Sequence, residues 1–124
     1  MKKATLSIFT TLFCSLTFCT AAQGSSKVTL RSLTLEGLGT SFSAINVGVG
    51  VSNINLTVEN CVIDRFNNQG IEFVATGTNT LSIEDTNIRN GNGQAISLEN
   101  PVSATIDNCR LEKNLGSQLS VSGA

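Results

Sequence analysis

The stretch LTVENCVID (residues 56–64) returns 48 residues later as ATIDNCRLE (104–112), with its cysteine at the same position. Two further versions, VTLRSLTLE (28–36) and LSIEDTNIR (81–89), precede and separate this pair, so the four copies start 28, 25 and 23 residues apart. A period in the twenties is typical of a solenoid, in which each copy packs only against its neighbours. The repeat therefore decides the fold of most of the chain.

Apolar residues alternate with polar ones along each copy, which predicts short strands with one buried face. After a polar, glycine-containing turn, each copy ends in a second apolar segment: AINV (44–47), GIEF (70–73), AISL (95–98) and QLSV (118–121). Equivalent positions carry similar residues in all copies, so we expect like residues to stack in inward-facing columns. These columns are Leu30, Val58, Ile83 and Ile106; Leu33, Cys61, Thr86 and Cys109; Leu35, Ile63, Ile88 and Leu111; Ile45, Ile71, Ile96 and Leu119; and Val47, Phe73, Leu98 and Val121.

The alternation skips one position in every copy, at Ser32, Asn60, Asp85 and Asn108. A bend at that residue explains the skip, because Asn and Asp tolerate the left-handed backbone that such a bend needs. Stacked side-chain amides can also hydrogen-bond from copy to copy. Each copy is thus predicted to run strand, bend, strand, polar turn, strand, loop.

This pattern resembles the right-handed parallel β-helix of pectate lyases and of many secreted bacterial repeat proteins. It is most similar to the bacterial proteins described only as parallel β-helix repeat-containing. The resemblance is carried by VTLRSLTLEGLGTSFSAINV (28–47), LTVENCVIDRFNNQGIEF (56–73) and LSIEDTNIRNGNGQAISL (81–98), and the repeats cover about four-fifths of the chain. It implies an all-β, right-handed parallel β-helix solenoid of about four coils. A leucine-rich repeat is the main alternative, but the Asn or Cys that it requires occurs in only one copy, at Asn114.

The first 22 residues predict a secretory signal peptide. A short basic start, Met1-Lys2-Lys3, precedes the uncharged apolar run ATLSIFTTLFCSLTFCTAA (4–22), which ends in small residues. A retained membrane anchor is the alternative, although the most apolar part is short for a membrane span. We therefore expect a signal peptide at 1–22, cleaved near Ala22, and a β-helix domain at 23–124. The expected location is the periplasm, the cell surface or the extracellular space.

Loss of Lys2 and Lys3 leaves six basic and nine acidic residues, a net charge of −3. This balance argues against nucleic acid or an anionic membrane as partner. The two remaining cysteines, Cys61 and Cys109, lie two copies apart, or about 9.5 Å between Cα atoms. A disulfide needs about 7 Å or less. We expect both to be free, buried and inert, and since the chain has no histidine we predict no metal and no cofactor.

Two outward columns of charged residues are predicted on the first two strands of each copy. Carboxylates one strand apart lie about 5 Å from each other, close enough for a glycosidase pair or a Ca²⁺ site, but a solvated ladder is the simpler interpretation. In the second column, Arg89 stands between two carboxylates and predicts ion pairs between copies. The columns are Arg31, Glu59, Glu84 and Asp107, and Glu36, Asp64, Arg89 and Glu112.

The resemblance implies that any active site lies on the outward face of the GIEF-type segments, which form the first sheet of that family. Glu72 and Glu99 sit there on successive copies and could pair, but no basic residue accompanies them to support lyase chemistry. The polygalacturonase motifs are absent as well, so we predict no catalytic residue. Asn46, Glu72 and Glu99 remain candidates for surface binding. Phe42 and Phe66 lie in turns, where they either stack on a sugar or fill a corner.

These features predict an exported, non-catalytic structural or interaction module, with extracellular polysaccharide as the candidate partner. The alternatives are a fragment or relative of a polysaccharide lyase or glycoside hydrolase, and a segment of an adhesin-like solenoid. Four coils leave two open ends, and exposed strand edges favour pairing with other strands. We therefore expect either end-to-end self-association or further coils in a longer chain.

Overall fold

The computed structural model describes residues 2–7, 11–12, 16–18, 26–39, 43–49, 52–100 and 102–122, with only the backbone described for 2–18 and for 26. All regular structure in these residues is β-strand. None of it is a helix that could span a membrane.

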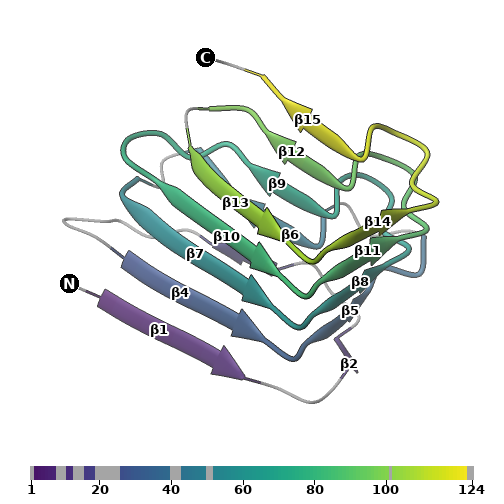
Figure 1. The fold of residues 1–124 in the computed structure, drawn as a ribbon, viewed down its shortest axis with the longest axis horizontal. Coiled ribbons are helices and arrows are strands. Elements are labelled where there is room, and N and C mark those ends of the chain that lie inside the picture. Colours follow the sequence, from purple (N-terminus) through teal and green to yellow (C-terminus); the bar gives the residue numbers. More distant parts are fainter. Residues whose placement is uncertain are drawn as a thin grey trace.

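The strands form three sheets, and the chain visits the sheets in turn (Figure 1). Sheet A contains β1 (Lys2–Ser7), β4 (Ser26–Arg31), β7 (Ile54–Glu59), β10 (Thr80–Glu84) and β13 (Ser103–Asp107). Sheet B contains β2 (Thr11–Leu12), β5 (Thr34–Glu36), β8 (Val62–Asp64), β11 (Asn87–Arg89) and β14 (Arg110–Glu112). Sheet C contains β3 (Leu16–Phe18), β6 (Ile45–Val47), β9 (Ile71–Phe73), β12 (Ile96–Leu98) and β15 (Leu119–Val121). We call β4–β6, β7–β9, β10–β12 and β13–β15 the first to fourth coils.

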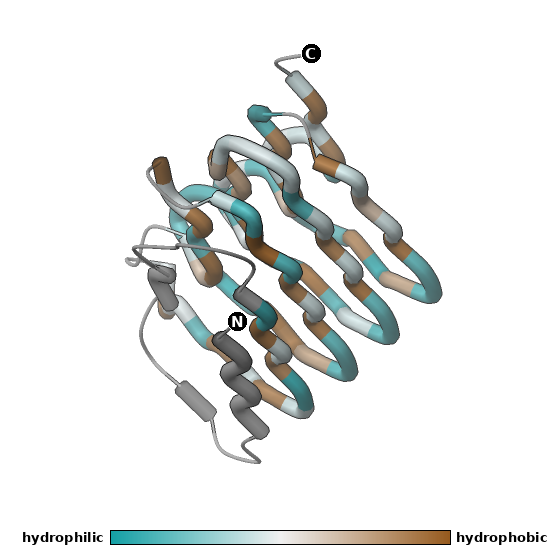
Figure 2. Tube along the Cα trace, turned by 90° about the vertical axis from the view of Figure 1, so that its left-hand side faces the viewer, coloured by the Kyte–Doolittle hydropathy of each residue, from teal (hydrophilic) through white to brown (hydrophobic). Residues whose placement is uncertain are grey.

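Every strand pairs in parallel with its equivalent in the neighbouring coil, so the chain is a parallel β-solenoid of about four turns. The predicted columns are confirmed by the register: Ile83 lies between Val58 and Ile106, and Ile71 lies between Ile45 and Ile96. Along the tube of Figure 2, apolar and polar positions alternate within a coil and recur at similar places in the next.

The core is the stack of inward-facing side chains between the three sheets. Its largest fully buried members include Leu30, Leu33, Leu35, Ile45, Ile54, Leu56, Ile63, Phe66, Ile71, Phe73, Leu81 and Ile83. Burying one such side chain contributes about 1.5–3 kcal/mol, so these columns are the main source of stability.

The predicted bend between the first and second strands of each coil is confirmed. Its four residues have left-handed φ angles of 57° at Ser32, 53° at Asn60, 48° at Asp85 and 48° at Asn108. Side chains also bond across coils there: Asn60 Nδ2 donates to Ser32 Oγ at 3.3 Å, and Asn108 Nδ2 donates to Asp85 Oδ1. The bend therefore combines a local backbone preference with a ladder of polar contacts.

A second left-handed position, which the sequence pattern did not predict, follows the strands of sheet B. Arg65, Asn90 and Lys113 have φ angles of 58°, 57° and 56°. The chain turns sharply here, and a Cβ placed on Gly93 would lie 2.2 Å from the carbonyl oxygen of Asn68. The turn is thus closely packed on the coil beside it.

Phe66 is buried in this turn, which confirms that it fills a corner and is not an exposed stacking surface. A Cβ on Gly37 would lie 2.8 Å from the Phe66 ring, so the ring packs directly beneath the glycine of the preceding coil. Phe42 lies outside the described residues.

The predicted signal peptide overlaps β1–β3. These strands pair in parallel with β4–β6, which places Leu6 opposite Leu30, Leu12 opposite Leu35 and Phe18 opposite Val47 in the register. Ala22 lies outside the described residues. The signal peptide and its cleavage stay a prediction.

Both repeat cysteines are free, as expected. Cys61 is buried, but the expected burial of Cys109 is wrong because its side chain is partly exposed. The reason is its place in the fourth coil: β13, β14 and β15 are the outermost strands of their sheets, so no further coil in the described residues covers that side.

Candidate functional site

The outward side of sheet C brings together two of the three residues proposed for surface binding. Asn46 lies opposite Glu72 in the register, and Glu72 lies opposite Ser97. Both Asn46 and Glu72 are partly exposed, whereas Ser97 is only 3 % exposed. Ser120, opposite Ser97 in the fourth coil, is partly exposed as well, but the amide and the carboxylate of this column lie on the first two coils.

Glu72 is held by hydrogen bonds from the preceding coil. Its Oε2 accepts from Asn46 Nδ2 at 2.6 Å and from Ser43 Oγ at 3.0 Å. Ser43 Oγ also lies 3.1 Å from Gln69 Oε1, and because a hydroxyl has one proton it serves one of these acceptors at a time. We call Ser43, Asn46, Gln69 and Glu72 the sheet C polar cluster.

The sequence did not indicate Ser43 or Gln69 as members of this cluster. Both lie in the turn that leads into sheet C, before the alternation of the strand begins. A signal was nevertheless present, since the two residues occupy equivalent positions in successive copies. The backbone bond from Ala44 N to Gln69 O, 3.1 Å long, places these turns side by side.

Glu99 is separate from this cluster. It follows β12, and its backbone N–H donates to Phe73 O at 3.0 Å. Since Glu72 lies opposite Ser97, Glu99 stands two positions farther along the sheet. The two carboxylates that could have formed a glycosidase pair therefore do not face each other across the coils.

The first charged column on sheet A is a solvated ladder with one ion pair. Arg31 Nη2 lies 2.7 Å from Glu59 Oε2, and the two side chains are 53 % and 33 % exposed. At that exposure the pair contributes about 0–1 kcal/mol. Glu84 accepts a hydrogen bond from Ser82 Oγ at 2.8 Å within its own strand. Among the described residues, no group of three or more His, Cys, Asp or Glu side chains could hold a metal ion.

The second column, on sheet B, forms one of the two predicted cross-coil pairs. Arg89 Nε lies 3.3 Å from Asp64 Oδ2, as expected. Glu112 is instead 2.9 Å from Arg110 of its own strand. Arg65 pairs with Glu36 of the preceding coil, a contact that the sequence pattern did not indicate because Arg65 lies in the turn. The Arg89–Asp64 and Arg65–Glu36 pairs join neighbouring coils and give sheet B a structural role.

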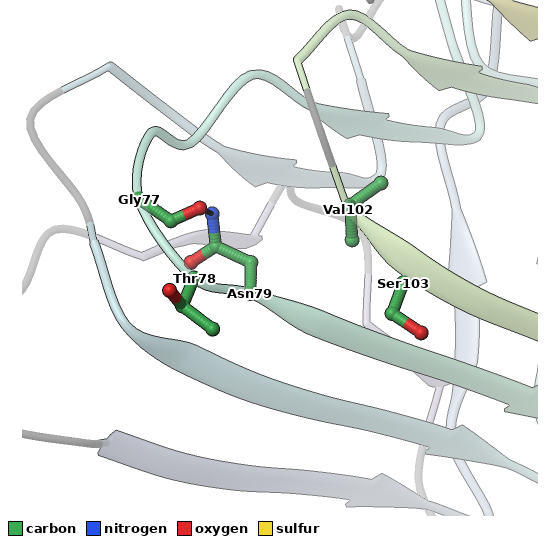
Figure 3. A pocket seen from close by; sticks show the side chains of 5 residues that line it. All are labelled: Gly77, Thr78, Asn79, Val102 and Ser103. Atoms are coloured by element: carbon green, nitrogen blue, oxygen red, sulfur yellow. Dashed lines mark hydrogen bonds between the residues drawn. The ribbon is translucent and has the colours of Figure 1, made fainter.

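A shallow hollow of about 410 Å³ lies where the loop after β9 meets the start of β13. Figure 3 shows the five residues that line it: Gly77, Thr78, Asn79, Val102 and Ser103. Asn79 is 3 % exposed, and its side chain is already engaged by the backbone. Its Oδ1 accepts from Ile54 N at 3.0 Å, and its Nδ2 donates to Thr76 O at 3.0 Å and to Gly77 O at 3.2 Å.

Asn79 is a structural residue that sequence reasoning missed. The sequence did carry a signal for it: the equivalent positions in the neighbouring coils hold the apolar residues Ile54 and Val102, and Asn79 is the polar exception. Because its acceptor bonds the neighbouring coil and its donor closes the loop, it offers the hollow little for recognising a ligand. The sheet C polar cluster therefore remains the better candidate for binding.

The sheet C polar cluster offers hydrogen-bond donors and acceptors but not the carboxylate pair that glycoside hydrolysis uses. It presents a carboxylate and two amides within one hydrogen-bonded group, whereas hydrolysis of a glycosidic bond requires two facing carboxyl groups.

Comparisons with protein-family models, with curated proteins and with solved structures gave no match to this chain.

Proposed function

We propose that residues 23–124 form an exported, non-catalytic interaction module that contacts extracellular polysaccharide through the sheet C polar cluster. The proposed framework is a right-handed parallel β-helix of the pectate-lyase-like kind, from a bacterium, and the proposed location is the periplasm, the cell surface or the extracellular space. The signal-peptide pattern in residues 1–22 supports export, and the repeat motifs support the family.

The observation that carries this proposal is the way Glu72 is held. Hydrogen bonds from Asn46 and Ser43 orient its carboxylate on a partly exposed face before any ligand arrives. A preorganised acceptor loses less conformational freedom on binding than a mobile side chain. Sugar hydroxyls are donors and acceptors, so a carboxylate beside amide groups offers them complementary partners. Binding at this cluster needs no second carboxylate, and Glu99 does not supply one opposite Glu72.

Thermal unfolding in the presence of polysaccharides tests the proposal. The chain is melted alone and with neutral and uronate-containing polymers, each with and without Ca²⁺. A ligand that binds only the folded state stabilises it by mass action, by about 2.7 kcal/mol at a hundred times its dissociation constant. We expect one class of polymer to raise the melting temperature. A melting temperature that no polymer changes contradicts the proposal.

Two variants locate the binding surface. Glu72→Gln removes the charge of the cluster, and we expect it to abolish the rise in melting temperature. Glu84→Gln is the matched control, because Glu84 also accepts from a serine hydroxyl but lies on sheet A. It should leave the effect of the polymer intact. Equal losses in both variants would show that the cluster is not the contact.

The alternative is that the chain is a relative of polysaccharide lyases or glycoside hydrolases. The same mixtures of chain and polymer test it when the length of the polymer is measured. Shortening of the polymer by the chain, lost in Glu72→Ala, would replace the binding module with an enzyme. The adhesin-like alternative predicts binding to cell-surface polymers without shortening.

A further inference from the structure

Within the residues that the structure describes, no further coil covers the apolar side chains of the fourth coil. Val121 is 71 % exposed and Leu119 is 47 % exposed, whereas Leu98 and Ile96, their equivalents in the third coil, are 4 % and 0 % exposed. In the described residues, β13, β14 and β15 each have a strand on one side only. An apolar patch beside unpaired strand edges is a surface prepared for another chain.

The outer edge of the first coil is the surface that could pair with the β13–β15 edge. In the full chain, that edge pairs with β1–β3, all of which lie within the predicted signal peptide. Removal of residues 1–22 takes those partners away and leaves β4, β5 and β6 with an unpaired edge. The strand order places these two edges at opposite ends of the stack, as the positions of β4 and β13 in Figure 1 show.

Extending the existing register by one coil pairs like residues. If β4–β6 of a second copy followed β13–β15, Ile106 would lie opposite Leu30, Leu111 opposite Leu35, and Val121 opposite Val47 of that copy. These pairings repeat the rule of the interior, where Ile83 lies opposite Val58 and Leu98 opposite Phe73.

The charges favour the same partner. Asp107 belongs to the column of Arg31, Glu59 and Glu84, in which Arg31 is the single basic residue and stands at the other end. Extension by one coil would place Arg31 of the second copy beside Asp107. Within the chain, Arg31 reaches the carboxylate of the adjacent strand at 2.7 Å, and a guanidinium has donors enough for two carboxylates. One position opposes the contact, because Glu112 would meet Glu36, although Arg110 and Arg65 already neutralise those two groups.

We propose that, once residues 1–22 are removed, the β13–β15 edge of one copy binds the β4–β6 edge of a second copy in parallel. In the full chain, β1–β3 occupy that edge and prevent the contact. Such a head-to-tail interface does not close on itself and produces open chains of copies. A two-fold contact between two β13–β15 edges offers Asp107 no Arg31, so the charges favour the head-to-tail arrangement. This inference rests on the removal of the signal peptide proposed above.

Analytical ultracentrifugation of two forms of the protein tests the proposal. The full chain is purified from the cytosol, and the exported product is collected from a secreting bacterium, with its N-terminus read by mass spectrometry. We expect the full chain to sediment as a monomer. The product that begins near residue 23 should form a series of oligomers whose size grows with concentration.

A matched pair of variants identifies the contacting edge. Val121→Lys places a charge within the proposed interface and should weaken association about tenfold or more, since an unpaired charge would be buried there. Ser120→Lys adds the same charge to the same strand but on its outward side, and should leave assembly unchanged. A melt of each variant shows that its fold is intact.

The outcomes separate the two proposals. A product that keeps Met1 overturns the removal of residues 1–22, on which export and the exposure of the β4–β6 edge both rest. A full chain that already assembles overturns the covering role of β1–β3. A product that begins near residue 23 but stays monomeric overturns self-association while export stands. Assembly that stops at dimers, or that Ser120→Lys weakens as much as Val121→Lys, overturns the head-to-tail interface.

Discussion

The third and fourth coils follow nearly the same residue pattern but differ in what covers them. Ile83 and Ile106 occupy one column, yet Ile83 is fully buried and Ile106 is partly exposed. The third coil has a neighbour on both sides, and the fourth, within the described residues, has one. Alternation therefore decides which way a side chain points, whereas its burial depends on the next coil. In a solenoid, the stability of a coil comes largely from its interfaces with the coils beside it.

The largest expected effect tests this difference directly. Ile83→Ala should lower the free energy of unfolding by about 2–5 kcal/mol, because the cavity is surrounded on both sides. Ile106→Ala should cost less than half as much, because its side chain is already partly exposed and the surface can relax around the gap. Urea denaturation of the full chain measures both. Equal losses for the two variants would show that the fourth coil is covered in solution.

The cysteines extend the comparison to chemical reactivity. Burial raises the pKa of both thiols above the ordinary value of 9.0, and Cys61, in the second coil, is the more deeply buried of the two. Because the thiolate is the reactive form, both should be alkylated more slowly than in the unfolded chain. Cys109 should react about tenfold faster than Cys61. Peptide mapping separates both sites from Cys14 and Cys19. Equal alkylation rates at Cys61 and Cys109 would contradict the difference in their burial.

The raised pKa of the Cys61 thiol also makes the stability of the fold depend on pH. Below about pH 9 the thiol is protonated in both the folded and the unfolded chain, so stability does not depend on it. As the pH rises above 9 toward the raised folded-state pKa, only the unfolded chain loses the proton, and the free energy of unfolding falls. Cys61→Ala should show a smaller fall than the unchanged chain over that range.

The order of strands and the inward columns could be predicted because each depends on local alternation repeated four times. The bend at Asn60 and Asp85 was predictable for the same reason, since these side chains tolerate a left-handed backbone. The second left-handed position was not predictable from Arg65 or Lys113, because neither residue type favours that conformation. The turn after Lys113 packs tightly on the neighbouring coil, since a Cβ on Gly116 would lie 2.8 Å from the carbonyl carbon of Gly93.

The candidate site was predictable only along the strands. Asn46 and Glu72 meet because the register places equivalent strand residues side by side. Ser43 and Gln69 lie in turns, where alternation carries no information about direction. Glu99 was expected beside Glu72, but it stands two positions beyond Ser97, the residue that lies opposite Glu72. Register along a strand thus decides contact, and the face alone does not.

The smallest expected effect comes from a substitution at the second left-handed position, where the third coil has Asn90 and the fourth has Lys113. Asn90 and Lys113 have nearly the same left-handed φ, but asparagine adopts it at lower cost than lysine. Asn90 Nδ2 also donates to Asp64 Oδ1 at 2.8 Å, whereas the equivalent residue for position 113 is Arg89, which has no acceptor. Lys113→Asn therefore gains only the backbone preference, and should raise the free energy of unfolding by about 0.5–1 kcal/mol. Lys113→Ala is the control, because it removes the same charge and keeps the backbone cost. An equal gain in both variants would assign the effect to charge and not to the turn.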